Sequence, residues 1–117
     1  MIQGIGIDMV ELSRIDKIII SNSSFIQRVL TEEEYGVFLG LSHKRQVEFL
    51  AGRFACKEAF SKALGTGIGP VGLQDIEILN DLNGAPRVTK SPYQGHVFVS
   101  ISHTDQHAVA QIILETV

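Results

Sequence analysis

The 117-residue sequence has only one cysteine, no long apolar run and no excess of positive charge. The single cysteine, Cys56, excludes an internal disulfide and is typical of a protein in a reducing compartment. Apolar runs such as Ile18–Ile20 fall far short of the ~20 residues that a membrane-spanning helix needs. The N-terminus has no basic segment followed by an apolar core, so we expect no secretory signal. We therefore expect a cytoplasmic protein that does not bind membranes.

The formal net charge of −3 argues against general nucleic-acid binding. Eight of the ten lysines and arginines nevertheless lie between Arg14 and Lys62, so a basic surface for an anionic partner is compatible with the sequence. Charge alone favours the plainer interpretation, in which these side chains lie on solvated helix faces.

The length fits one domain, residues 1–117, and 44% of the residues are hydrophobic, which is enough for a core. Ser13 is the expected N-cap of the first helix, Thr31 begins a capping box with Glu34, and Asn83-Gly84 predicts a hairpin turn. Periodicity predicts strands at 2–10, 74–79, 87–89, 96–102 and 107–114, and helices at 13–20, 25–30, 31–41 and 43–64. This order predicts an α+β fold, in which a small antiparallel sheet packs on one long helix and on shorter helices.

The long helix expected at 43–64 has apolar residues on two sides. On a helical wheel, one apolar stripe also contains Glu58, and Arg53 and Lys57 fall between the stripes. The first stripe is Val47, Leu50, Ala51 and Phe54, and the second is Phe49, Cys56, Phe60 and Ala63. Because one small domain has few elements with which to cover both stripes, we expect a homo-oligomer.

A carboxylate in an apolar stripe needs a partner, and the sequence offers two kinds. Glu58 and Lys62 are four residues apart and can form an ordinary helical salt bridge, which is the commoner arrangement. The alternative is a metal site shared with Asp8, an aspartate in a strand beside two glycines that leave space for a ligand. Two carboxylates near a phosphate are the usual protein ligands of Mg²⁺. Arg53, Lys57 and Lys62 would then neutralise phosphate charge, which predicts phosphoryl-transfer chemistry.

Other chemistries have weaker support in the sequence. Ser102 and His103 are adjacent, but no Gly-x-Ser-x-Gly elbow accompanies them, and the four histidines lack zinc-site spacing. The glycine-rich segment 65–72 lacks the Gly-Lys-Ser/Thr of a P-loop, so a phosphate cradle and a flexible loop remain equal alternatives. Two rival functions also remain open, a non-catalytic nucleotide-binding oligomer and a magnesium-dependent phosphohydrolase.

Three segments carry a more specific signal, and the second has the pattern Arg-Phe-x-x-Lys-Glu-Ala-x-x-Lys. They are residues 4–8, 49–67 and 99–104. Together they closely resemble bacterial holo-acyl-carrier-protein synthases, the small single-domain class of 4′-phosphopantetheinyl transferases. The resemblance implies transfer of 4′-phosphopantetheine from coenzyme A to a serine of apo-acyl carrier protein, in support of fatty acid biosynthesis. Holo-acyl carrier protein and adenosine 3′,5′-bisphosphate are the implied products, and a homotrimer with active sites between subunits is the implied assembly.

The resemblance also assigns roles by position. Asp8 and Glu58 would bind Mg²⁺ with the coenzyme A pyrophosphate, Glu58 would help to remove the serine proton, and Lys62 would stabilise phosphate charge. The residues implied for the nucleotide are Lys44, Arg53 and His103 at its phosphates, and Asn83, Gly84 and Pro86 at its adenine. The residues implied for carrier-protein docking are Arg14, Ile18, Phe25 and Arg28.

One departure from the family concerns the first helical region. Relatives often carry additional basic residues there, whereas this chain has Ser21 and Ser24. We therefore expect carrier-protein binding to depend more on apolar contact through Ile18 and Phe25, or to be weaker.

Overall fold

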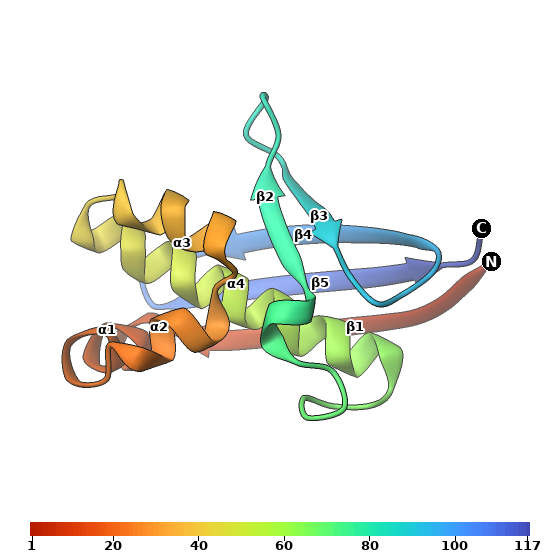
Figure 1. Cartoon of the computed structure of the whole chain (residues 1–117), viewed down its shortest axis with the longest axis horizontal. Coiled ribbons are helices and arrows are strands. Elements are labelled where there is room, and N and C mark those ends of the chain that lie inside the picture. The colour runs from red at the N-terminus through yellow and green to blue at the C-terminus, as the bar shows by residue number, and fades with distance from the viewer.

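The computed structural model describes all residues, 1–117, and confirms the α+β fold (Figure 1). In chain order the elements are β1 (Ile2–Glu11), α1 (Leu12–Ser21), α2 (Ser24–Val29), α3 (Glu32–Leu39), α4 (His43–Leu64), a 3₁₀ turn (Leu73–Asp75), β2 (Glu77–Asn80), β3 (Pro86–Lys90), β4 (His96–His103) and β5 (His107–Glu115). None of the helices is both long and apolar enough to cross a membrane.

The strands form two antiparallel sheets. One has the order β1-β5-β4, and the other is the β2–β3 hairpin, which projects from the body of the molecule (Figure 1). Helix α4 lies along the three-stranded sheet, and α1, α2 and α3 gather near its N-terminal half. The chain ends meet, because the Thr116 amide donates to the Met1 carbonyl at 2.9 Å.

The glycines of β1 bring its backbone directly against the backbone of α4. A Cβ atom on Gly4 would lie 2.0 Å from the Ala63 carbonyl oxygen, and one on Gly6 would lie 1.9 Å from that of Ala59. The expectation that these glycines leave space for a ligand is therefore wrong, since helix backbone fills that space. Their alternate neighbours Ile5, Ile7 and Met9 point away and are about 60% exposed (61%, 58% and 62%).

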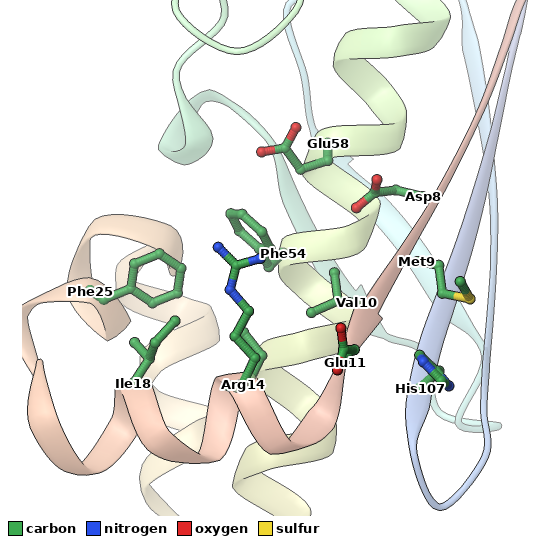
Figure 2. Close-up of a pocket in the computed structure, with 11 residues that line it drawn as sticks. Asp8, Met9, Val10, Glu11, Arg14, Ile18, Phe25, Phe54, Glu58 and His107 are labelled. Atoms are coloured by element: carbon green, nitrogen blue, oxygen red, sulfur yellow. The ribbon is translucent and has the colours of Figure 1, made fainter.

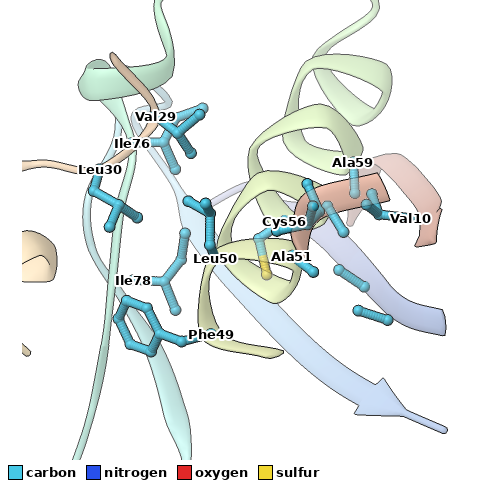
Figure 3. Packing of buried hydrophobic residues seen from close by; sticks show 14 of the residues in the cluster. Val10, Val29, Leu30, Phe49, Leu50, Ala51, Cys56, Ala59, Ile76 and Ile78 are labelled. Atoms are coloured by element: carbon cyan, nitrogen blue, oxygen red, sulfur yellow. The ribbon is translucent and has the colours of Figure 1, made fainter. Parts of the chain in front are cut away.

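Both apolar stripes of α4 are covered within one chain. Six of the eight stripe residues are buried, and only Phe54 and Ala63 are half-buried. Figure 3 shows Phe49 and Leu50 facing Leu30 and Ile78, while Ala51 and Ala59 lie on the side of Val10. The argument that this helix needs a second subunit for its cover is therefore wrong.

Local signals account for most element boundaries. Helix α4 begins at His43 and ends at Leu64 as expected, and Gly65 follows in the left-handed conformation with φ 84°. The Thr31–Glu34 capping box is present, and α3 ends at Leu39 rather than near residue 41. The hairpin turn at Asn83-Gly84 is also present, because Gly84 has φ 85° and the Asp81 amide donates to the Ala85 carbonyl at 2.8 Å.

Two further boundaries differ from expectation. Ser13 does not cap α1, since the helix begins at Leu12 directly after β1. The Leu12 amide donates instead to the Gln106 carbonyl of the β4–β5 turn at 2.9 Å, so a tertiary contact replaces the side-chain cap. The strand expected at 74–79 starts as a 3₁₀ turn and becomes β2 only at Glu77.

Replacing Gly6 by alanine is expected to destabilise the fold by at least about 3 kcal/mol, because the new methyl group would overlap the α4 backbone. The matched control is Gly36→Ala in α3, where a Cβ meets nothing within 4 Å. That change is expected to stabilise by about 0.5–1 kcal/mol, because alanine favours helix. Chemical denaturation measures both variants, and equal effects would refute the packing account.

Candidate active site

The close packing of β1 on α4 brings Asp8 and Glu58 together. Asp8 shares the helix-facing side of β1 with Gly6, and both carboxylates line a cavity of about 410 Å³. Figure 2 shows the two side chains next to each other at one end of this cavity, with Arg14, Ile18 and Phe25 toward the other. The predicted pairing of the two carboxylates is thus present in the structure.

The environment of Glu58 disfavours its charge. Partial burial raises the pKa of the Glu58 carboxyl, and the negative charge of Asp8 raises it further, while Lys62 has the opposite effect. A carboxylate in this situation gains from a cation placed between it and Asp8.

Lys62 does not pair with Glu58, although it follows one turn later on α4. Its ammonium group instead donates to Asp8 Oδ1 at 2.9 Å and to the Ile7 carbonyl at 2.9 Å. The helical salt bridge between Glu58 and Lys62, the plainer alternative from the sequence, is therefore wrong.

The donor set fits magnesium better than zinc. No group of three histidine, cysteine or carboxylate side chains converges to hold a metal ion, so the chain offers two carboxylates, Asp8 and Glu58. Mg²⁺ is commonly bound by one or two carboxylates with substrate phosphates and waters, whereas zinc sites need three or four protein ligands.

Most of the residues assigned to carrier-protein docking line the same cavity. Arg14, Ile18 and Phe25 are among its walls, and Arg28 lies above the Phe25 ring with its guanidinium 5.8 Å from the centroid. Sequence reasoning missed Phe54, whose ring lies 5.4 Å from that of Phe25. The helical wheel assigned Phe54 to the core, and only its half-exposure reveals a place in the site.

The residues assigned to the nucleotide lie elsewhere in the chain. Arg53, Gly84, Pro86 and His103 line a second cavity of about 300 Å³, which shares no wall residue with the Asp8–Glu58 cavity. Lys44 lines a third cavity that adjoins the second through their common residue Glu48. The structure therefore divides the predicted site residues into two separate groups.

Two predicted nucleotide or phosphate residues make contacts within the protein. Asn83 donates its backbone N–H to Asp81 in the hairpin turn. Arg53 donates to the Ile78 carbonyl and the Asn80 side chain, each at 3.1 Å, while its guanidinium carbon lies 4.1 Å from the Phe49 ring centroid. Its side chain is 6% exposed but reaches the wall of the second cavity.

Lys57 is not available to a phosphate. It is fully buried and donates to Glu34 Oε1 at 2.5 Å and to the Val29 carbonyl at 2.6 Å. Burial lowers the pKa of the Lys57 ammonium, and the charge of Glu34 opposes this effect. The expectation that Lys57 neutralises substrate phosphate is wrong, because the wheel could not show that α3 and β2 cover this side of α4.

Comparison with known proteins identifies the family of this chain. Residues 4–112 match the family model of the 4′-phosphopantetheinyl transferase superfamily. This chain belongs to that superfamily. The holo-[acyl-carrier-protein] synthase of Enterococcus faecalis is 67% identical over 116 residues, which cover 99% of each chain.

Solved structures of holo-(acyl-carrier-protein) synthases share the fold over nearly the whole chain. The crystal structure of a holo-(acyl-carrier-protein) synthase from Bacillus anthracis in complex with CoA (3′,5′-ADP) has a TM-score of 0.94 and 50% identity, covering 100% of this chain and 99% of that one. The Helicobacter pylori holo-[acyl-carrier-protein] synthase in complex with coenzyme A has a TM-score of 0.82 and 33% identity, covering 95% and 99%.

Glu58→Gln is expected to raise thermal stability at pH 7, by less than about 1 kcal/mol because the carboxylate is partly solvated. The raised pKa means that the folded protein holds the Glu58 proton more tightly than the unfolded chain does. Stability therefore falls as pH rises from the ordinary value of 4.5 through the folded pKa.

The gain from Glu58→Gln should accordingly be present near pH 7 and shrink toward pH 4.5, as melting curves between pH 8 and pH 5 can show. Glu11→Gln, at an exposed carboxylate of the same cavity, is the control and should leave the melting temperature unchanged. A Glu58→Gln variant less stable than the parent at pH 7 would contradict the expected sign.

Proposed function

We propose that this chain is a holo-acyl-carrier-protein synthase with a magnesium-dependent active site at Asp8 and Glu58. It transfers 4′-phosphopantetheine from coenzyme A to a serine of apo-acyl carrier protein and leaves adenosine 3′,5′-bisphosphate. The observation that carries the proposal is the cavity in which the carboxylate pair adjoins Arg14, Ile18 and Phe25. A carboxylate pair for the diphosphate and an apolar wall with an arginine for an acidic protein are what this reaction requires.

Each group in the cavity has a chemical task. Asp8 and Glu58 would hold Mg²⁺, which supplies positive charge to the diphosphate when bound. Glu58, at the same end of the cavity as Asp8, would help to remove the serine proton. Lys62, whose ammonium donates to Asp8, would stabilise the charge that develops on the phosphate during in-line attack.

The nucleotide would be bound by the second group of residues. Arg53, His103 and Lys44 are the proposed phosphate contacts, and Gly84 with Asn83 and Pro86 is the proposed adenine contact. Since their cavities share no wall with the Asp8–Glu58 cavity, we propose that each complete site combines these residues of one copy with the carboxylates of another.

The outer face of the three-stranded sheet supports a homotrimer. Ile5 and Phe98 both pair with Ile113, so three apolar side chains lie in one row across β1, β5 and β4. Ile5 is 61% exposed and Phe98 is 51% exposed. Exposed apolar surface of this kind marks an interaction site, and we assign it to contact between copies of this chain.

Incubation with coenzyme A, Mg²⁺ and apo-acyl carrier protein should add the mass of one phosphopantetheine arm to the carrier protein, as intact mass spectrometry can detect. Asp8→Asn and Glu58→Gln should each reduce the rate at least about 100-fold, because loss of a metal ligand removes transition-state stabilisation. Hydrolysed coenzyme A with unmodified carrier protein would indicate the rival phosphohydrolase. A folded chain that leaves both substrates unchanged would indicate the nucleotide-binding oligomer.

Arg14→Ala is expected to raise the KM for carrier protein about tenfold and to leave the KM for coenzyme A nearly unchanged, because a basic side chain on α1 meets an acidic partner. Lys17→Ala, an exposed basic residue of α1 outside the cavity wall, is the matched control. Steady-state kinetics with each substrate varied in turn measures the split. Equal changes in both KM values would count against a docking role.

Ile5→Lys is expected to convert the assembly to monomers, because a charge on the apolar outer face opposes its burial between copies. Activity should fall together with the assembly, since the two groups of site residues would then be separated. Sedimentation velocity measures the assembly, and Ile20→Lys, at an exposed isoleucine on α1, is the control. A monomeric parent protein, or an Ile5→Lys trimer, would disprove this interface.

A further inference from the structure

Lys62 already occupies the position at Asp8 that a metal ion would need. Its ammonium donates to Asp8 Oδ1 and to the Ile7 carbonyl, each at 2.9 Å, and makes no other hydrogen bond to the protein. Its side chain is 53% exposed, whereas that of Asp8 is 19% exposed. The carboxylate is thus held in place by its strand, and the lysine is the partner that is free to move.

Two cations cannot share this carboxylate without repulsion. A divalent ion at Asp8 would lie within a few ångströms of the ammonium group, and neither charge is fully screened at this distance. In the free protein the ammonium forms its salt bridge with Asp8 and not with Glu58, which feels the charge of Lys62 without a direct ion pair. A phosphate at the site would provide an alternative partner, because lysine binds phosphate as a mobile point charge.

We propose that Lys62 competes with the metal ion for Asp8 in the empty site and makes metal binding depend on the arrival of the diphosphate. Without a nucleotide, metal binding has to displace the ammonium from Asp8. With the nucleotide present, Lys62 moves from the carboxylate to a phosphate oxygen, and the competition ends. By linkage, the nucleotide and the metal ion each strengthen the binding of the other by the same factor. This inference rests on the proposed function, because it assumes that Asp8 is a metal ligand.

The test is Mn²⁺ binding to the folded protein, measured by electron paramagnetic resonance with and without coenzyme A. Lys62→Met keeps a stem of similar length and removes the charge. It is expected to bind Mn²⁺ about three- to tenfold more tightly than the parent without coenzyme A, since the competing ion pair is gone. The factor by which coenzyme A tightens Mn²⁺ binding should be smaller in Lys62→Met by a similar amount.

Two further variants serve as controls. Lys62→Arg keeps the competing charge and should bind Mn²⁺ as weakly as the parent in the absence of nucleotide. Lys90→Met removes one positive charge at the end of β3, where the side chain donates to the Gln74 carbonyl, and should leave Mn²⁺ binding unchanged. If only Lys62→Met binds Mn²⁺ more tightly than the parent, the effect comes from local competition and not from a general change in net charge.

Asp8→Asn distinguishes failure of this inference from failure of the proposed site. If Asp8→Asn binds Mn²⁺ as the parent does, the carboxylate is not a metal ligand and the proposed site is wrong. The competition is disproved if Asp8→Asn loses Mn²⁺ binding but Lys62→Met binds Mn²⁺ no more tightly than the parent. It is also disproved if coenzyme A tightens Mn²⁺ binding by the same factor in Lys62→Met as in the parent. The proposal is supported if Asp8→Asn loses Mn²⁺ binding and Lys62→Met binds Mn²⁺ more tightly than the parent.

Discussion

The direct contact between the backbones of β1 and α4 determines where the candidate site lies. Gly4 lies against Ala63 and Gly6 against Ala59, so two strand residues span one helical turn. The matching rises make this possible, since two strand residues advance about 6.6 Å and four helical residues about 6 Å. Asp8 follows two residues after Gly6 on the same side of β1, so it lies about one helical turn nearer to the start of α4. Because lysine side chains on a helix lean toward its N-terminus, Lys62 reaches back to this carboxylate.

The opposite side of α4 is fixed by buried charges. Lys57 and Glu34 form an ion pair with no exposed side-chain surface. Glu34 also accepts from the Thr31 amide at 2.9 Å and from the Ile78 amide at 2.8 Å, so one carboxylate joins the start of α3, the middle of α4 and β2. Burial of two charges is tolerated only where such hydrogen bonds satisfy them. Consecutive residues of α4 therefore have different roles. Lys57 links α4 to α3 through its buried ion pair with Glu34, whereas Glu58 faces the cavity.

The features that were predicted correctly are those that depend on residues close together in the sequence. The bounds of α4, the Thr31–Glu34 capping box and the Asn83-Gly84 turn follow from caps, periodicity and turn chemistry, and all three are present. The predictions that failed are those that depend on which element packs against a given side of a helix or strand. The wheel showed the direction of Lys57 but not that α3 would bury it, and the strand pattern showed two glycines but not that a helix would fill their space. The meeting of Asp8 with Glu58 was predictable only because each was out of place in its own apolar element.

The separation of the two groups of residues limits how one chain can act. The Asp8–Glu58 cavity adjoins α1 and α2, which suits a protein substrate, while the Arg53–His103 cavity adjoins the β2–β3 hairpin. Under the proposed function both groups must meet around the same molecule, because coenzyme A carries its nucleotide and its reactive diphosphate on one short chain of atoms. In a single copy, the two cavities share no wall residue. In the proposed homotrimer, the apolar row of Ile5, Ile113 and Phe98 would be the surface through which each copy supplies the residues that its neighbour's site lacks.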